Sequence, residues 1–371
     1  MQNDDKLKNI KESLLAVMRA PRRWLLLVGT GASVDLDEAL GMPALKDHLL
    51  KPGTIPDSTD GWMPVAEKLR RGVDLETALT GINPTESLQN EIARHTAAFV
   101  ARKDTALRDD VLTGEKTWAG EQLLKQLMRG LSPTWPRLPV VTPNYDMLIE
   151  YACSKANIPY ITGYHGGIIR RQNWPKARER LCRINPVTMG GKRRDTITPI
   201  SCVELMKVHG SINLFRCNSD GAFVESDVWT VDCPADYTPV IAPPGAAKTQ
   251  EALNFHDRLF GEALKAIDKA IAFFVIGYGF RDDHIHQKIL ERVRNHQCPL
   301  VVLTLDPSEE LDKLVTEGKD VWVITGINNQ ANGETDRSGT RFANSREELC
   351  GEFDRITLWQ SDVFTKQILG G

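Results

Sequence analysis

The chain has 371 residues, enough for one large domain or two modest ones, and its hydrophobic fraction of 41% and charged fraction of 26% are ordinary globular values. Its net charge of −3 gives no overall basic field, so direct binding to nucleic acid is not expected. The seven cysteines include no CxxC pair, which argues against a disulfide framework. The N-terminus is polar, and no apolar run approaches the roughly 20 residues that span a bilayer, which argues against a membrane segment. Together these features predict a cytoplasmic protein.

The first strand signal is the apolar run Leu25–Val28 after Trp24, and a turn of small residues follows it. Such a turn lets the backbone approach a ligand closely, and its N–H groups can converge on a phosphate at the start of a helix. The residues of this turn are Gly29, Thr30, Gly31, Ala32 and Ser33. A strand followed by a glycine turn is the entry to a nucleotide-binding α/β domain. Taken alone, the pattern fits a tight strand–helix turn without a ligand equally well.

From about residue 44 to residue 130 the pattern is mostly helical, with apolar faces such as Leu123, Leu124 and Leu127. A helical stretch of this length between two strand signals predicts an inserted α-helical subdomain.

The second clear strand is Leu138–Thr142, and Asn144 and Asp146 follow it directly. Open α/β sheets bind ligands at the carboxyl ends of their strands, so these two polar side chains are candidate site residues. The alternative is that both residues only cap the helix that follows.

A third strand signal, Val203–Val208, leads into His209 and Gly210. An imidazole at a strand end can titrate near neutral pH, although a structurally hydrogen-bonded histidine fits the same pattern. His165 is a rival, ranked lower because its lead-in is less strand-like. The region of about 160–240 otherwise predicts a small irregular or β module, and its single cysteines do not have the paired spacing of a structural zinc site.

The last part of the chain contains a buried strand signal over residues 271–276 that ends in a second glycine turn, Gly277–Phe280. Further strands are predicted at Pro299–Leu305, ending at Asp306, and at Val321–Ile324. Residues 328–347 are polar and predict a mobile segment. Together these elements predict an α/β protein over residues 1–371, with a Rossmann-like parallel sheet and helices on both faces.

Several of these motifs, in this order, resemble the SIR2 (sirtuin) superfamily. Gly29–Ser33 resembles its first phosphate-binding loop, and Gly41–Pro43 stands where the family has Gly-Ile-Pro. Thr142–Asp146 resembles the Thr-Gln-Asn-Ile-Asp element, and Val208–Gly210 resembles the catalytic His-Gly. Two further segments correspond to the later Gly-Thr-Ser turn and to the adenosine-binding strand end: Gly277–Phe280 and Leu305–Pro307.

The chain departs from sirtuin deacylases, which carry two CxxC pairs for zinc and a Phe-Arg where Ala44–Lys46 stand here. The runs His209–Asn213 and Ile276–Asp283 look more like the bacterial SIR2-like proteins of antiphage defence, which hydrolyse NAD and often work with a HerA-type ATPase or another defence partner. The resemblance therefore implies an NAD+ hydrolase without zinc. Because toxic NAD hydrolysis has to be restrained, a homo-oligomer is expected. The alternatives are an NAD-dependent protein deacylase and a non-catalytic NAD- or ADP-ribose-binding module.

The resemblance also implies roles for individual residues. Asn144 and His209 would be catalytic, and Asp146 would hydrogen-bond beside the cleaved bond. The pyrophosphate would lie on Gly29–Ser33. The adenosine side would be lined by Gly277, Tyr278 and Gly279, with Asp306 at the adenine ribose.

Overall fold

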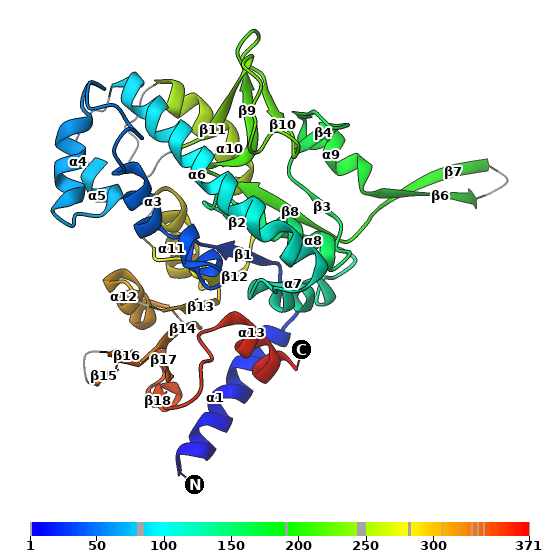
Figure 1. Ribbon diagram of the computed structural model, residues 1–371. Coiled ribbons are helices and arrows are strands. Elements are labelled where there is room, and N and C mark those ends of the chain that lie inside the picture. The colour runs from blue at the N-terminus through cyan, green and yellow to red at the C-terminus, as the bar shows by residue number, and fades with distance from the viewer. Residues whose placement is uncertain are drawn as a thin grey trace.

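A nine-stranded sheet forms the centre of the molecule (Figure 1). The computed structural model describes residues 2–79, 85–189, 192–242, 250–280, 283–305, 307–318, 320–327, 329–331, 334–336 and 338–370. The strands in spatial order are β18 (Gly351–Phe353), β17 (Thr340–Asn344), β14 (Val321–Gly326), β13 (Leu300–Thr304), β12 (Ala272–Ile276), β1 (Trp24–Val28), β2 (Arg137–Thr142), β8 (Cys202–Lys207) and β3 (Tyr160–Ile161). All neighbours from β14 to β3 pair in parallel.

Strand β1 lies in the middle of this sheet and is buried along its whole length. Leu26 and Val28 belong to the apolar cluster on one face, whereas Leu25 and Leu27 belong to the cluster on the other. A strand that is buried on both faces has to be apolar at every position, which explains the uninterrupted run in the sequence.

Helices cover both faces of the sheet (Figure 1), so the predicted α/β fold with a Rossmann-like parallel sheet is confirmed. One face is covered by α10 (Gln250–Lys269), α11 (Asp283–His296) and α12 (Glu309–Glu317). The other face carries α1 (Gln2–Arg19), α8 (Leu148–Lys155), α13 (Ser361–Phe364) and η3 (Thr365–Leu369). Within the described part of the chain, no helix has the length and apolar composition needed to cross a membrane.

The regular elements that the structure describes between β1 and β2 are all helical. Its elements are α2 (Gly31–Val34), η1 (Glu38–Leu40), α3 (Met42–Leu49), α4 (Trp62–Arg70), α5 (Leu75–Leu79), α6 (Glu86–Thr113) and α7 (Gly120–Arg129). Buried side chains of these helices, such as Trp62 and Leu123, join the same apolar cluster as Leu26 and Val28. The segment therefore extends the core of one sheet face.

A second, five-stranded sheet stands beside β8 and β3 (Figure 1). Its strands in spatial order are β11 (Tyr237–Ile241), β9 (Gly210–Cys217), β10 (Phe223–Glu225), β5 (Arg170–Gln172) and β4 (Tyr164–Gly166). A separate ribbon of β6 (Cys182–Met189) and β7 (Lys192–Pro199) follows α9 (Trp174–Arg180) and projects from the body (Figure 1). The chain crosses from the first sheet to the second at His209, between β8 and β9.

The prediction of a mobile segment over residues 328–347 is wrong for β17, which pairs antiparallel with β14. The inward positions of β17 are Thr340, Phe342 and Asn344, and all three are buried. Two of them are polar because they bond to neighbouring backbone: the Thr340 hydroxyl donates to the Ile356 carbonyl, and Asn344 Nδ2 donates to the Val321 carbonyl at 2.7 Å. The remaining short elements are β15 (Asn329–Ala331), β16 (Glu334–Asp336) and η2 (Glu347–Leu349).

Candidate functional site

The carboxyl ends of four neighbouring strands meet at one edge of the large sheet. Val28 of β1 pairs with Ile276 of β12, and Thr142 of β2 pairs with Lys207 of β8. The chain order reverses between β1 and β12, because the strands after β1 add on one side and those after β12 add on the other. This reversal is the position at which open α/β sheets bind ligands. The predicted site segments 29–33, 144–146, 209 and 277–279 all follow these strand ends.

The two glycine turns contact each other directly. Gly31 N donates to Gly277 O at 2.8 Å, and Gly29 N donates to Ile276 O at 2.9 Å. Gly277 has a φ of +59°, and a Cβ atom on it would lie 2.2 Å from Ala32 N. A Cβ atom on Gly29 would lie 2.5 Å from Gly277 O. Both turns therefore require glycine, because each fills the space in which the other would carry a side chain.

The backbone of the first turn is already hydrogen-bonded within the protein. Ala32 N donates to Gly29 O at 3.1 Å, and Ser33 N donates to Thr30 O at 2.9 Å, bonds that start the short helix α2. A pyrophosphate held by Gly31, Ala32 and Ser33 would share these N–H groups with carbonyl oxygens. The predicted pyrophosphate contacts of Gly29–Ser33 stay a prediction.

Asn144 packs against the first glycine turn. Its Nδ2 donates to Gly29 O at 3.1 Å and to Ser33 Oγ at 3.0 Å, and its Oδ1 accepts from Thr30 Oγ1 at 3.4 Å. The side chain is only 5% exposed. Because both amide hydrogens are used on the turn, the described hydrogen bonds of Asn144 link β2 to β1 rather than capping a helix.

Asp146 links the start of α8 to the first glycine turn. Its Oδ1 accepts from Leu148 N, the first residue of α8, at 3.2 Å, and its Oδ2 accepts from Ser33 Oγ at 2.8 Å. Its role toward a ligand stays a prediction. Ser33 therefore donates to Asp146 and accepts from Asn144, and the three side chains form one buried chain of hydrogen bonds.

The segment that carries Asn144 and Asp146 is held from α6 by Asp104. This carboxylate is almost fully buried; it accepts from Met147 N at 2.7 Å and from Tyr151 OH at 2.5 Å. Burial raises the pKa of Asp104 to about 7, although the bonds from Met147 and Tyr151 oppose the rise. The helical segment between β1 and β2 is thus linked to the candidate site by a group that titrates near neutral pH.

Replacing Asp104 with asparagine should change how stability depends on pH. The folded protein holds a proton on Asp104 between about pH 4 and pH 7, where the unfolded chain has lost it, so this group contributes less stability as pH rises through that window. We expect the free energy of unfolding of Asp104→Asn, relative to the parent, to rise from pH 5 to pH 8 by on the order of 2–3 kcal/mol. Urea unfolding at both pH values measures this, and an identical difference at the two would contradict it.

Lys207, which the sequence interpretation missed, joins three segments below the candidate site. Its ammonium donates to the Asp146 carbonyl and to Ser211 Oγ at 2.9 Å, and pairs with Glu150 Oε1 at 2.7 Å. Ser211 Oγ also donates to Tyr145 O at 3.2 Å. Lys207 therefore fixes the strand end that carries His209 to the loop that carries Asn144.

A signal for this network is present in the sequence. Lys207 ends a strand that is apolar except for Glu204, and Glu150 interrupts an apolar helical run, so each is a charge at a position where the periodicity predicts burial. A buried charge requires a partner of opposite sign.

His209 stands at the crossing between the two sheets. Ala242 N donates to His209 O at 2.9 Å, and the imidazole lies 5.8 Å from the Phe260 ring, measured between centroids. Gly210 has a φ of +87°, and a Cβ atom on it would lie 2.0 Å from Val240 O. The glycine therefore allows β11 to approach and fixes the direction in which the chain leaves His209. The rival His165 is exposed on β4, an edge strand of the second sheet.

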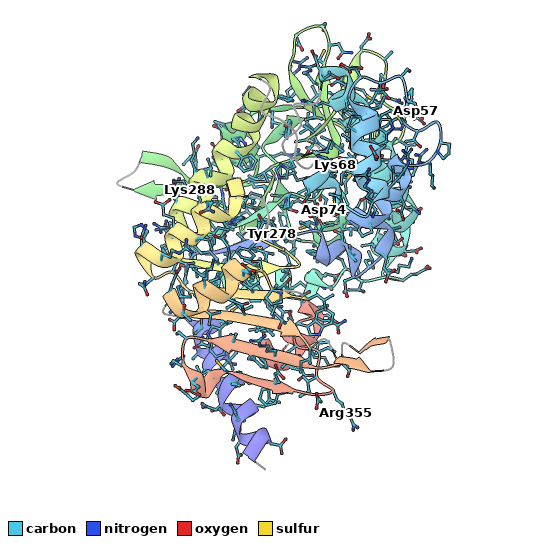
Figure 2. All side chains as sticks on the ribbon, turned by 90° about the vertical axis from the view of Figure 1, so that its left-hand side faces the viewer. Asp57, Lys68, Asp74, Tyr278, Lys288 and Arg355 are labelled. Carbon is cyan, nitrogen blue, oxygen red and sulfur yellow. The ribbon has the colours of Figure 1, made fainter. Side chains whose placement is uncertain are left out.

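The second glycine turn contributes mostly backbone. Tyr278 lies near the middle of the molecule (Figure 2), and its ring packs into the core beside Phe280 with a centroid distance of 5.2 Å. Gly279 is exposed. Asp306 lies outside the described residues. The adenosine contacts of Gly277, Tyr278, Gly279 and Asp306 stay predictions.

Metal binding has no support among the residues that the structure describes. No group of three or more histidine, cysteine, aspartate or glutamate side chains is arranged to hold an ion there. All seven cysteines are free thiols, including Cys217 and Cys233.

Comparisons with known proteins return solved Sir2 structures. No protein-family model and no curated protein matches the chain. A structure of Sir2Tm bound to a propionylated peptide is 15% identical, with a TM-score of 0.40, and the match covers 84% of this chain and 91% of that one. A Sir2 complex with a p53 peptide and NAD+ is 13% identical, with a TM-score of 0.38, and covers 83% of this chain and 90% of that one.

Proposed function

We propose that this protein is a SIR2-like NAD+ glycohydrolase, which splits NAD+ and water into nicotinamide, ADP-ribose and a proton. The observation that carries the proposal is the buried chain Asn144–Ser33–Asp146 on the first glycine turn, beside the strand end that carries His209. This arrangement combines the motifs of the resemblance at the switch point of the sheet, where a dinucleotide is expected.

Cleavage of NAD+ requires little covalent chemistry from the protein. The nicotinamide of NAD+ is already a cationic leaving group, and cleavage passes through an oxocarbenium-like state, as in glycoside hydrolysis. In the proposed mechanism Asn144 orients the attacking water or the ribose through Oδ1. His209 accepts the proton that the water loses and acts as the general base. Asp146 stabilises the positive charge that develops on the sugar.

The substrate would lie across both glycine turns. The pyrophosphate would contact Gly29–Ser33 at the start of α2, and the adenosine would lie along Gly277–Gly279, with Asp306 at its ribose. No step in this scheme requires a metal ion.

In this proposal the enzyme acts in bacterial antiphage defence, where depletion of NAD+ stops the infected cell. The support is the likeness of His209–Asn213 and Ile276–Asp283 to defence proteins. Such an activity has to be restrained, which favours a homo-oligomer controlled by a HerA-type ATPase or another defence partner. The projecting ribbon is a candidate contact, because Ile184 and Ile197 pair across its strands and both are exposed.

Product analysis tests the proposal. The purified protein is incubated with NAD+, alone and with an acetyl-lysine peptide, in the absence and presence of a candidate partner, and the products are separated by chromatography. Nicotinamide with free ADP-ribose, formed without peptide, is the expected result. O-acetyl-ADP-ribose formed only with peptide would identify a deacylase instead. Stabilisation by NAD+ in a melting experiment, without nicotinamide release under any condition, would identify a non-catalytic binding module.

A further inference from the structure

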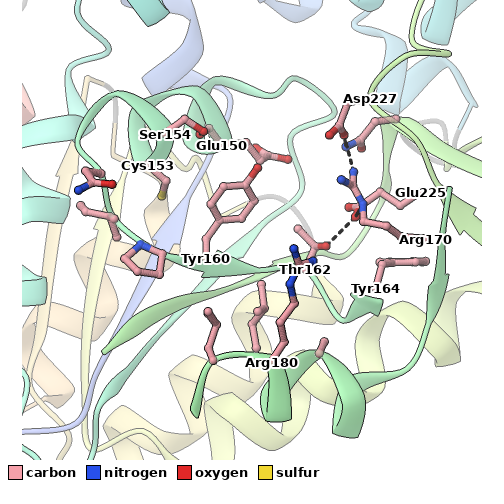
Figure 3. A pocket seen from close by; sticks show the side chains of 17 residues that line it. Glu150, Cys153, Ser154, Tyr160, Thr162, Tyr164, Arg170, Arg180, Glu225 and Asp227 are labelled. Carbon is pink, nitrogen blue, oxygen red and sulfur yellow. Dashed lines mark hydrogen bonds and ion pairs between the residues drawn. The ribbon is translucent and has the colours of Figure 1, made fainter. Parts of the chain in front are cut away.

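A cavity of about 370 Å3 lies between the edge of the large sheet and the second sheet (Figure 3). Its wall combines the end of α8 and strand β3 on one side with β5, β9, β10 and α9 on the other. None of the residues assigned above to NAD+ lines it. The cavity is therefore separate from the candidate NAD+ site.

Three carboxylates line the cavity, and each is paired with a cationic side chain. Arg170 pairs with Glu225 at 2.8 Å and with Asp227 at 2.6 Å, so one guanidinium serves two carboxylates (Figure 3). Thr162 Oγ1 also donates to Glu225, at 2.8 Å. A third carboxylate, Glu150, lines the cavity from α8, with the Tyr160 ring standing next to it (Figure 3).

Two buried oxygen atoms on this wall lack a hydrogen-bond partner among the described residues: Glu150 Oε2 and Asn213 Oδ1. Both side chains are 2% exposed. The orientation of the Asn213 amide is fixed, because its Nδ2 donates to Asp227 Oδ1 at 2.9 Å and a carboxylate only accepts. A buried acceptor without a donor costs about 1–3 kcal/mol, so both atoms favour a ligand that brings N–H groups.

We propose that this cavity binds a small organic cation whose ammonium or guanidinium group donates to Glu150 and Asn213. Glu150 is already paired with Lys207 through Oε1, at 2.7 Å, so the cation is bound by the two acceptors that remain, Glu150 Oε2 and Asn213 Oδ1. The body of the ligand lies against side chains of the cavity such as Ile158, Tyr160 and Leu181. Arg180, which is exposed at the end of α9, also lines the cavity. Its positive charge opposes cation binding at the entrance.

Three matched probes test this assignment: the cation phenylguanidine, its neutral isostere phenylurea, and the anion benzoate. Binding to the full chain is followed by ligand-observed NMR titration. We expect phenylguanidine to bind at one site at least tenfold more tightly than phenylurea, a difference of about 1.4 kcal/mol, and benzoate not to bind. Equal affinities for phenylguanidine and phenylurea, or no binding of phenylguanidine up to roughly 10 mM, would overturn the proposal.

Three variants locate the site. Glu150→Gln keeps the shape and removes the charge, and should weaken phenylguanidine binding about tenfold. Ser154→Trp, at an exposed position on the lining, should block the cavity without disturbing the core. Arg180→Glu should strengthen binding a fewfold, so the test does not depend on Glu150→Gln folding. Binding that all three variants leave unchanged would refute the assignment.

Discussion

Asn144→Ala is expected to lower the rate of NAD+ cleavage by on the order of a thousandfold. The variant loses the group that orients the reacting partner, together with two hydrogen bonds to the first glycine turn, at 3.0 and 3.1 Å. His209→Ala is expected to have a loss of similar size, because the water would no longer have a general base. Both rates are measured as nicotinamide released at saturating NAD+.

The structural cost of Asn144→Ala can be separated from its chemical cost. Truncation leaves Ser33 Oγ and Gly29 O with one donor fewer, which should reduce the free energy of unfolding by about 1–3 kcal/mol. Urea unfolding checks that the variant is folded under assay conditions, and thermal stabilisation by NAD+ checks that it still binds substrate.

His165→Ala is the matched control. His165 is also a histidine followed by glycine, but it lies exposed on β4 of the second sheet. We expect its variant to retain the parental rate. If both Asn144→Ala and His209→Ala cleaved NAD+ at the parental rate, the catalytic assignment would be wrong. If His165→Ala lost activity, the catalytic histidine would be the one on the second sheet.

Lys207→Met is expected to destabilise the fold by about 3–5 kcal/mol, the usual effect of leaving one partner of a buried ion pair alone. Glu150 would lose the ammonium at 2.7 Å in an environment where burial already raises its pKa. The Asp146 carbonyl and Ser211 Oγ would lose their donor at the same time. Urea unfolding at pH 7.5 measures the effect, and NAD+ cleavage should also fall because the backbone of Asp146 loses its donor from the strand end beside His209.

A double variant and a surface control sharpen this prediction. Glu150→Gln should recover part of the stability of Lys207→Met, because it removes the buried charge that the first substitution leaves alone. Lys288→Met breaks an exposed pair with Glu291, at 3.1 Å, and should cost at most about 1 kcal/mol. If Lys207→Met were as mild as Lys288→Met, the ammonium would not be what holds the site together.

The parts of the fold that the sequence predicted correctly are those in which local chemistry leaves few options. The runs at β1 and β12 are apolar at every position, and β13 is apolar up to its last residue, Thr304; only a strand buried on both faces needs this pattern. Glycine turns that follow such strands then place the candidate site at one sheet edge. Strand β17 was not predicted because two of its inward residues, Thr340 and Asn344, are polar. They hydrogen-bond to backbone carbonyl groups that come close only in the folded protein.

The sequence predicts which residues belong to the candidate site but not which hydrogen bonds they form. Asn144, Asp146 and Ser33 were all identified, yet their mutual hydrogen bonds depend on how β2 is placed against β1. Lys207 and Asp104 were missed, because the backbone groups that they bind, Asp146 O and Met147 N, lie far away in the sequence and are not marked by residue type. For Lys207 the available signal was a charge at the end of a mostly apolar strand.

The mutual contact of the two glycine turns has an evolutionary consequence. Where two side chains touch, a larger one can be accommodated by a smaller neighbour, and related sequences then show paired substitutions. Gly29 and Gly277 offer no such exchange, because glycine has no smaller replacement. Among homologues these positions are therefore expected to be invariant rather than to covary, and methods that infer proximity from correlated changes would overlook the contact that joins β1 to β12.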